Sequence, residues 1–88
     1  MRVVIQRVKQ ASVTMVNEDA SNTLVSEIGK GIVCLVGVHE GDERAHAEWM
    51  CKQIVGAKMF EGMSEENALK RWRSSVKQNG FEVLLVSQ

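Results

Sequence analysis

Apolar and polar side chains alternate along the first sixteen residues, a pattern that is typical of a β-strand. Residues 2–16 are also rich in Val, Ile and Thr, so we expect one long strand over this whole range. The side chains expected on one face of it are Val3, Ile5, Arg7, Ala11, Val13 and Met15. Residues 17–23 are polar and predict an exposed loop.

Two further apolar segments predict two more strands. Residues 24–28 form the first, and residues 32–38 form the second. The intervening residues 29–31, Gly-Lys-Gly, predict a tight hairpin connection between them. Because residues 32–38 are apolar throughout, this strand is expected at the centre of the sheet.

The middle of the chain shows helical rather than strand spacing. Asp42 is a suitable N-cap, and Gly56 is a suitable end for a helix between them. The apolar positions of this helix are Ala47, Met50, Cys51 and Ile54. Residues 58–60 predict a short strand, and residues 64–72 predict a second helix capped by Ser64.

The last apolar run ends on two polar residues. Residues 83–86 predict a strand that is covered on both faces, and Ser87 and Gln88 follow at its tip. Such a tip is rigid and open, as catalytic positions often are. A domain rarely ends inside its own core, so we expect residues 1–88 to be the N-terminal part of a longer, truncated single domain.

Composition narrows the class of protein. A hydrophobic content of 44% with 25% charged residues is ordinary for a globular domain, and the net charge is zero. A broad basic face for coating nucleic acid is therefore not expected, although contact with the end of an RNA is compatible with this charge. Cys34 and Cys51 lack metal-ligand spacing and predict two buried free thiols. Charges at Arg2 and Arg7 argue against a signal peptide, so a cytoplasmic protein without membrane contact is expected.

Two sequence blocks are distinctive in combination. The chain opens with Met-Arg-Val-Val-Ile-Gln-Arg-Val at residues 1–8 and closes with Leu-Leu-Val-Ser-Gln at residues 84–88. Together they resemble the D-aminoacyl-tRNA deacylases (D-tyrosyl-tRNA deacylases). The resemblance continues through residues 28–32, 35–38 and 58–60.

The resemblance implies a fold and an activity. The implied fold is of the α/β (mixed α+β) class, with a β-barrel-like mixed sheet and one clear helix. The implied enzyme is a homodimer that hydrolyses the ester joining a D-amino acid, or glycine, to the acceptor end of a tRNA, without a cofactor. The family's site joins a Ser-Gln-x-x-Thr strand end to a cis Gly-Pro motif reached across the dimer interface, and it rejects L-amino acids through main-chain carbonyls.

The chain contains only part of that pattern. Ser87 and Gln88 match its first two positions, the Thr position lies beyond Gln88, and the 88 residues contain no proline. A protein of these residues alone is therefore expected to be inactive. The rival interpretation is a non-catalytic, β-rich dimerisation or binding module of the same ancestry.

Each candidate residue has two interpretations. Ser87 and Gln88 either cap a sheet edge or, as the resemblance implies, supply oxyanion donors and hold the terminal adenosine. By pattern alone, Arg7 is an edge residue that reaches solvent. The resemblance implies instead that Arg7 steadies the Gly-Pro segment.

A basic cluster has the same ambiguity. Its members are Lys70, Arg71, Arg73 and Lys77. They form either a solvated face or a phosphate contact to the tRNA acceptor stem. Trp72 either stacks on a base or packs on the sheet. His39 and His46 have no motif that joins them to Ser87 as a Ser-His hydrolase would require.

Overall fold

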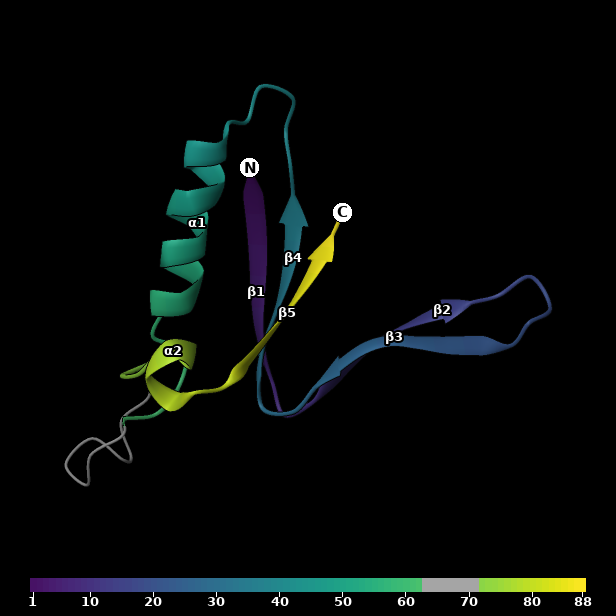
Figure 1. The fold of residues 1–88 in the computed structure, drawn as a ribbon. Coiled ribbons are helices and arrows are strands. Elements are labelled where there is room, and N and C mark those ends of the chain that lie inside the picture. Colours follow the sequence, from purple (N-terminus) through teal and green to yellow (C-terminus); the bar gives the residue numbers. More distant parts are fainter. Residues whose placement is uncertain (63–71) are drawn as a thin grey trace.

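The computed structural model describes residues 1–62 and 72–88. These residues form a mixed α+β fold, as expected, in which five strands accompany one main helix and one short helix (Figure 1). The elements in chain order are β1 (Arg2–Val8), β2 (Ala11–Val16), β3 (Asn22–Ile28), β4 (Gly31–Gly37), α1 (Arg44–Gly56), α2 (Val76–Asn79) and β5 (Glu82–Ser87).

The strands form two sheets. One has the order β1-β4-β5, with β4 antiparallel to β1 and parallel to β5, so the apolar strand is central as predicted. The other is the hairpin β2-β3, which projects away from the sheet and from α1 (Figure 1). Within the described ranges the strands do not close into a barrel, and the body is flat, with extents of 53 × 35 × 15 Å.

The prediction of one long strand over residues 2–16 was wrong. β1 ends at Val8 and β2 begins at Ala11 in the other sheet. The polar pair Lys9 and Gln10 separates them, and both residues are exposed. Alternation continues across this pair, so the pattern could not show that the chain leaves one sheet for another.

The predicted hairpin at residues 29–31 was also wrong, because β3 pairs with β2 whereas β4 pairs with β1 and β5. Gly31 is required for another reason. A Cβ atom on Gly31 would lie 1.8 Å from the main-chain oxygen of Glu82, where β4 and β5 begin side by side. The glycine therefore permits a close approach of two backbones rather than a tight turn.

The core lies between the three-stranded sheet and the helices. Its buried apolar residues are Ile32, Cys34, Ile54, Phe60 and Val76. The Phe60 and Phe81 rings meet edge to face with centroids 4.8 Å apart. Each buried side chain of this size contributes about 1.5–3 kcal/mol. The core therefore depends on one face of the sheet, which α1 and α2 cover.

Helix α1 differs from its prediction at the first turn. Its N-cap is Glu43, not Asp42, although it ends at Gly56 as predicted. Asp42 instead accepts hydrogen bonds from the Met1 ammonium group and from the His39 main chain. The apolar pattern located the helix, but a long-range contact competes for the predicted cap.

The two cysteines have different environments. Cys34 is fully buried, as predicted, and burial raises the pKa of its thiol. Cys51 is exposed, so its predicted burial was wrong. Of the apolar positions of α1, only Ile54 is buried.

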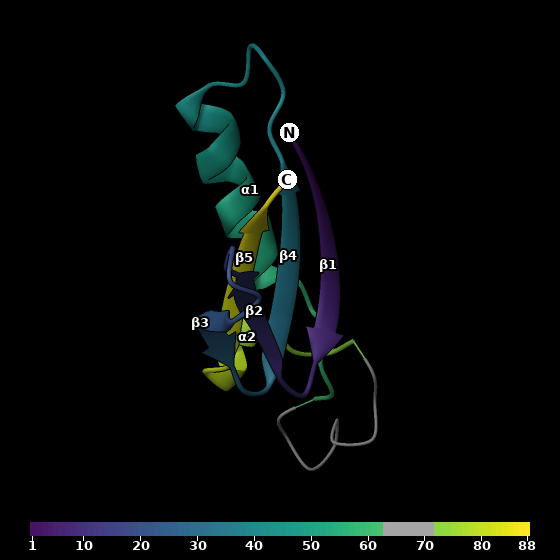
Figure 2. The ribbon, with the colours of Figure 1, turned by 90° about the vertical axis from the view of Figure 1, so that its right-hand side faces the viewer.

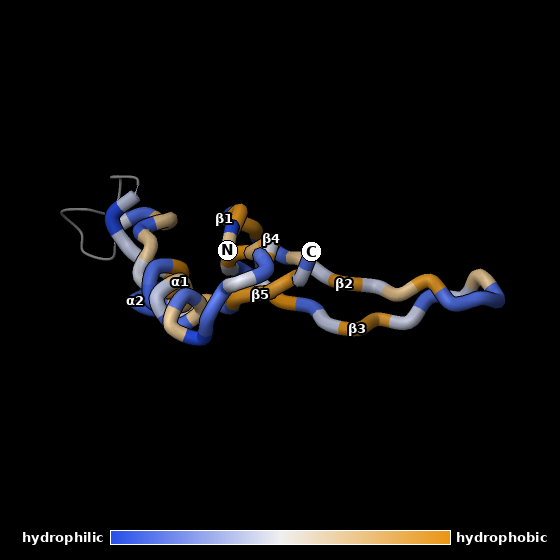
Figure 3. The backbone as a smooth tube through the Cα atoms, turned by 90° about the horizontal axis from the view of Figure 1, so that it is seen from above, coloured by the Kyte–Doolittle hydropathy of each residue, from blue (hydrophilic) through white to orange (hydrophobic). Residues whose placement is uncertain are grey.

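Strand β5 and the hairpin expose much apolar surface. β5 is not covered on both faces as expected, since Leu84 is 7% exposed but Leu85 is 57% exposed. The large apolar side chains exposed on the hairpin are Met15, Val16, Leu24 and Val25. Figure 3 shows these hydrophobic stretches along β2 and β3.

The region around residue 60 contains less regular structure than predicted. Instead of a strand at residues 58–60, Phe60 makes one isolated antiparallel bridge with Ser74. The predicted helix over residues 64–72 falls on residues outside the described ranges, except for Trp72. No helix in the described part of the chain is long and apolar enough to cross a membrane.

Candidate functional site

Strand β5 carries Ser87 and Gln88 to one end of the three-stranded sheet. Ser87 is level with Val36 of β4, and the Gln88 N–H donates to the Val36 carbonyl oxygen at 2.9 Å. At the start of the strand, the Glu82 N–H donates to the Lys30 carbonyl in the same way. Every second N–H of β5 therefore points to β4, and the Ser87 N–H points to the opposite edge.

That edge of β5 is unpaired within the described residues, because β4 is its only strand neighbour there. The Ser87 N–H is therefore a main-chain donor that the sheet does not use. Ser87 and Gln88 are both exposed, and alternation directs their side chains to opposite faces of the sheet. A ligand at the strand tip can meet a hydroxyl, an N–H and an amide from two consecutive residues.

A hollow of about 490 Å³ lies beside this strand, between β5 and the hairpin. Its walls include Val13, Val25 and Ser26 from the hairpin, and it extends along β5 to Ser87. Most of this lining is apolar, so the hollow suits an apolar group next to polar atoms. The hollow depends on where the hairpin lies relative to β5, and a local pattern of apolar residues does not encode that position.

The N-terminus is fixed at the same end of the sheet. The Met1 ammonium nitrogen lies 3.0 Å from Asp42 Oδ2, and the His39 N–H donates to the same carboxylate at 2.8 Å. The His39 N–H, followed by the Met1 ammonium group, lowers the pKa of Asp42. Figures 1 and 2 show both chain ends beside the end of β4.

We call this part of the sheet the open end and define it by Arg2, Gly37, Ser87 and Gln88. Gly37 ends β4, with Arg2 level with it on β1. Among the described residues, no hydrogen bond or ion pair involves the Arg2 side chain. The open end thus combines unused donors with an exposed cation.

Arg7 lies at the other end of the same strand. Its Nη1 atom donates to the Met59 carbonyl oxygen at 3.2 Å and lies 3.7 Å from a carboxylate oxygen of Glu61. Its guanidinium carbon also lies 5.3 Å from the centre of the Trp72 ring. We call these four residues, Arg7, Met59, Glu61 and Trp72, the closed end.

The closed end is far from the predicted catalytic residues within this chain. Arg7 is level with Ile32, and Ser87 is level with Val36, four residues further along β4. Four residues of a strand span about 13 Å. The chain therefore does not bring Arg7 to Ser87.

The basic cluster is only partly described. Lys70 and Arg71 lie outside the described ranges, whereas Arg73 and Lys77 are exposed. Trp72 is 54% exposed, and its ring meets the sheet through the guanidinium group of Arg7 in β1. Lys77 belongs to α2, which precedes β5, so it lies near the strand end opposite Ser87.

The histidines have local roles. His46 Nδ1 accepts a hydrogen bond from the Glu43 N–H at 2.9 Å and helps to start α1. His39 contributes its main-chain N–H to Asp42. In the described part of the chain, neither histidine hydrogen-bonds to Ser87, and no three His, Cys, Asp or Glu residues are grouped as metal ligands.

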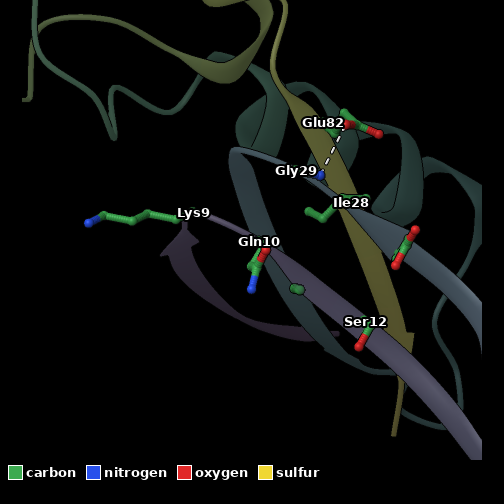
Figure 4. A pocket seen from close by; sticks show the side chains of 8 residues that line it. Lys9, Gln10, Ser12, Ile28, Gly29 and Glu82 are labelled. Atoms are coloured by element: carbon green, nitrogen blue, oxygen red, sulfur yellow. Dashed lines mark hydrogen bonds between the residues drawn. The ribbon is translucent and has the colours of Figure 1, made fainter.

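A second hollow of about 610 Å³ lies where the connections between the two sheets cross (Figure 4). Lys9, Gln10 and Ser12 line one side of it. On the other side, a Glu82 carboxylate oxygen accepts the Gly29 N–H at 3.1 Å. Since Glu82 begins β5, this hollow is separate from the open end.

Comparison with known proteins gives consistent matches over the whole chain. Residues 4–88 match the family described as D-Tyr-tRNA(Tyr) deacylase. The D-aminoacyl-tRNA deacylases of Drosophila melanogaster and Thermomicrobium roseum are each 44% identical over all 88 residues, which cover 49% and 51% of those proteins. A solved structure titled c-Myc DNA Unwinding Element Binding Protein aligns with a TM-score of 0.81 at 33% identity, over the whole chain and 53% of its own.

The chain thus spans about half the length of the curated relatives it matches. The family resemblance read from residues 1–8 and 84–88 is confirmed, since the match includes almost every residue. These 88 residues belong to the D-Tyr-tRNA(Tyr) deacylase family.

Proposed function

We propose that the longer protein containing this chain hydrolyses the ester bond of D-aminoacyl-tRNA, and of glycyl-tRNA, to the free amino acid and tRNA. This reaction would remove wrongly charged tRNA before translation uses it. The observation that carries the proposal is the family match over residues 4–88. The unused Ser87 N–H at the open end supports it, because ester hydrolysis requires donors for a developing oxyanion.

In the proposed reaction, water attacks the carbonyl carbon of the ester. The negative charge that develops on the carbonyl oxygen is stabilised by the Ser87 N–H, which needs no rearrangement because β5 holds it in place. The ester C–O bond then breaks, and the ribose oxygen leaves as a hydroxyl after taking a proton. The Ser87 hydroxyl and the Gln88 amide hold the terminal adenosine, whose 2′-OH distinguishes RNA from DNA.

The proposal assigns Arg7 to supporting the Gly-Pro segment of the family pattern. Arg7 is about 13 Å from the level of Ser87 along the sheet, so this role requires a segment outside these 88 residues or a second subunit. We propose a homodimer in which the exposed apolar side chains of the hairpin are covered. The remainder of the protein would extend the two sheets into the barrel-like fold of the family.

The remaining parts of the proposal concern partners and location. Arg73 and Lys77, together with Lys70 and Arg71, would contact phosphates of the tRNA acceptor stem. The enzyme would act in the cytoplasm without a metal ion or organic cofactor. The exposed positions of Arg73 and Lys77 support the phosphate contact.

A second candidate function is nucleic-acid binding without hydrolysis. The solved relative's title names a DNA element as its ligand, which favours a binding module of the same ancestry. The two candidates differ in whether the ester bond is broken. A binding module would retain D-aminoacyl-tRNA intact, whereas the proposed enzyme would release the amino acid.

The test is incubation of the full-length protein with D-tyrosyl-tRNA and, separately, with L-tyrosyl-tRNA. We expect rapid release of D-tyrosine, with the L-ester remaining intact over the same time. Binding of the D-ester without release would favour the second candidate. Equal hydrolysis of both esters would contradict a deacylase specific for D-amino acids.

A further inference from the structure

Arg2 and Gln88 lie on either side of Gly37 at the open end. Arg2 is level with Gly37 in the β1-β4 register. Ser87 is level with Val36, and the bond from the Gln88 N–H to Val36 extends that ladder by one residue. Arg2, Gly37 and Gln88 therefore follow one another across three strands, and their side-chain positions share one face.

Gly37 leaves the space between the other two positions free of a side chain. A Cβ atom on Gly37 would meet only the Arg2 carbonyl oxygen, at 3.6 Å, which is an ordinary contact. Arg2 and Gln88 are two strand spacings apart, about 10 Å. An exposed arginine side chain can extend across much of that distance, and no neighbouring side chain on β4 blocks it.

Arg2 differs from Arg7 and Arg44 in having no carboxylate partner among the described residues, a state that it shares with Arg73 of the basic cluster. Arg7 and Arg44 each have a carboxylate partner, Glu61 and Glu48 respectively. The Met1 ammonium group beside Arg2 is paired with Asp42. Within the described ranges, Arg2 is therefore the cation of the open end that is left without an ion pair.

We propose that Arg2 binds a phosphate of the substrate's last nucleotides, with Gly37 as the floor of this subsite. The inference rests on the proposed function, in which Gln88 holds the terminal nucleoside. A guanidinium group can donate two parallel hydrogen bonds to a phosphate, which fixes its orientation as well as its charge. By binding a phosphate of the RNA, the subsite would place the ester that is joined to this RNA at Ser87.

The test compares full-length protein with its Arg2→Gln variant on D-tyrosyl-tRNA. We expect about a tenfold increase in KM, about 1.4 kcal/mol in binding, with kcat within twofold. The slope of log(kcat/KM) against log salt should decrease in magnitude by about 0.7, as for one lost phosphate contact to a single strand. On the D-tyrosyl ester of adenosine, which has no phosphate, the two proteins should be equal.

Three further variants sharpen the test. Arg2→Lys keeps the positive charge but loses the planar guanidinium group that donates two parallel hydrogen bonds. Its KM should therefore lie between those of the parent and Arg2→Gln. Gly37→Val should raise KM by filling the gap, while a melting curve shows that the fold is retained. Lys9→Gln removes an exposed cation just beyond the far end of β1, so it should match the parent.

A binding measurement separates this subsite from the proposed function. A single-stranded RNA oligonucleotide with the tRNA acceptor-end sequence should bind Arg2→Gln about tenfold more weakly than the parent, whether or not the parent hydrolyses esters. That loss with an inactive parent would support the subsite and overturn the deacylase proposal. Normal parent activity with unchanged KM, salt slope and RNA affinity in folded Arg2→Gln would overturn the subsite alone. An equal loss on the phosphate-free ester would also overturn it.

Discussion

The two ends of the three-stranded sheet each have an arginine of β1, but these two arginines differ in their contacts. At the closed end, the Arg7 guanidinium contacts a carbonyl oxygen, a carboxylate and an aromatic ring. At the open end, the Arg2 side chain has no ion pair among the described residues, and the Ser87 N–H points to an unpaired strand edge. The closed end thus uses its polar groups within the chain, whereas the open end keeps them available.

The same contrast appears in two glycines of β4. Gly31 lies where β4 and β5 begin together, with no room for a Cβ atom. Gly37 lies at the open end, where a Cβ atom would meet only one atom at ordinary distance. The first glycine is required for the backbones to approach each other. The second leaves space that a ligand can occupy.

The largest expected effect comes from removing the rest of the protein. A chain of these 88 residues alone should release no D-tyrosine from D-tyrosyl-tRNA, since loss of positioned catalytic groups typically costs hundreds-fold or more. It should also self-associate, because the hairpin and one sheet face expose apolar side chains. Turnover near that of the full-length protein would show that the open end needs no further residues for catalysis. A monomer by light scattering would show that the exposed apolar side chains need no cover.

The two glycines provide the next test of the comparison. Gly31→Ala in the full-length protein should lower the free energy of unfolding by more than about 3 kcal/mol, because its methyl group overlaps the Glu82 backbone. Gly37→Ala is the matched control and should change it by less than about 1 kcal/mol. Denaturant unfolding measures both. Similar losses for the two variants would remove the distinction between the two ends.

Arg7→Ala tests whether the closed end only stabilises the fold. We expect a loss of about 1 kcal/mol in stability, since the Arg7 side chain is partly exposed to solvent. Activity of the folded full-length protein should fall by at least about tenfold, since the proposal assigns Arg7 to the Gly-Pro segment. Arg7→Lys should not restore it fully, because lysine lacks the planar fork. A large fall in melting temperature with normal specific activity would make Arg7 purely structural.

Asp42→Asn should have the smallest effect, and its sign depends on pH. The folded-state pKa of Asp42 is lowered, so its contribution to stability is present above its unfolded pKa of about 4 and is lost as pH falls through the folded pKa. The variant should melt slightly below the parent at pH 7, and the difference should shrink near pH 3. An equal difference at both pH values would exclude the ion pair with Met1 as its cause.

The sequence predicted the elements better than their arrangement. The central position of residues 32–38, the end of the helix at Gly56 and the burial of Cys34 were all confirmed. Each of these depends on a local pattern of apolar residues. The change of sheet at Lys9 and the pairing of β4 with β1 depend on contacts between distant segments, and alternation does not encode these.

The same limit applies to the site. The family resemblance directed attention to Ser87 and Gln88, which the structure places at an open strand end. It gave no indication of the space at Gly37 or of the hollow formed with Val13 and Val25. Both arise from strand register and from the position of the hairpin. The roles of Ser87, Gln88 and Arg7 remain predictions.

In the proposed reaction, the Ser87 N–H at the open end stabilises the oxyanion of a D-aminoacyl ester. Single-turnover release of D-tyrosine from D-tyrosyl-tRNA by full-length Ser87→Pro and Ser87→Ala tests it most directly. Proline removes an N–H that makes no bond to β4, whereas alanine removes only the hydroxyl. We expect the rate of release to fall by about 10²–10³-fold for Ser87→Pro and by much less for Ser87→Ala, with both variants folded. A folded Ser87→Pro protein that releases D-tyrosine at the parent's rate would contradict it.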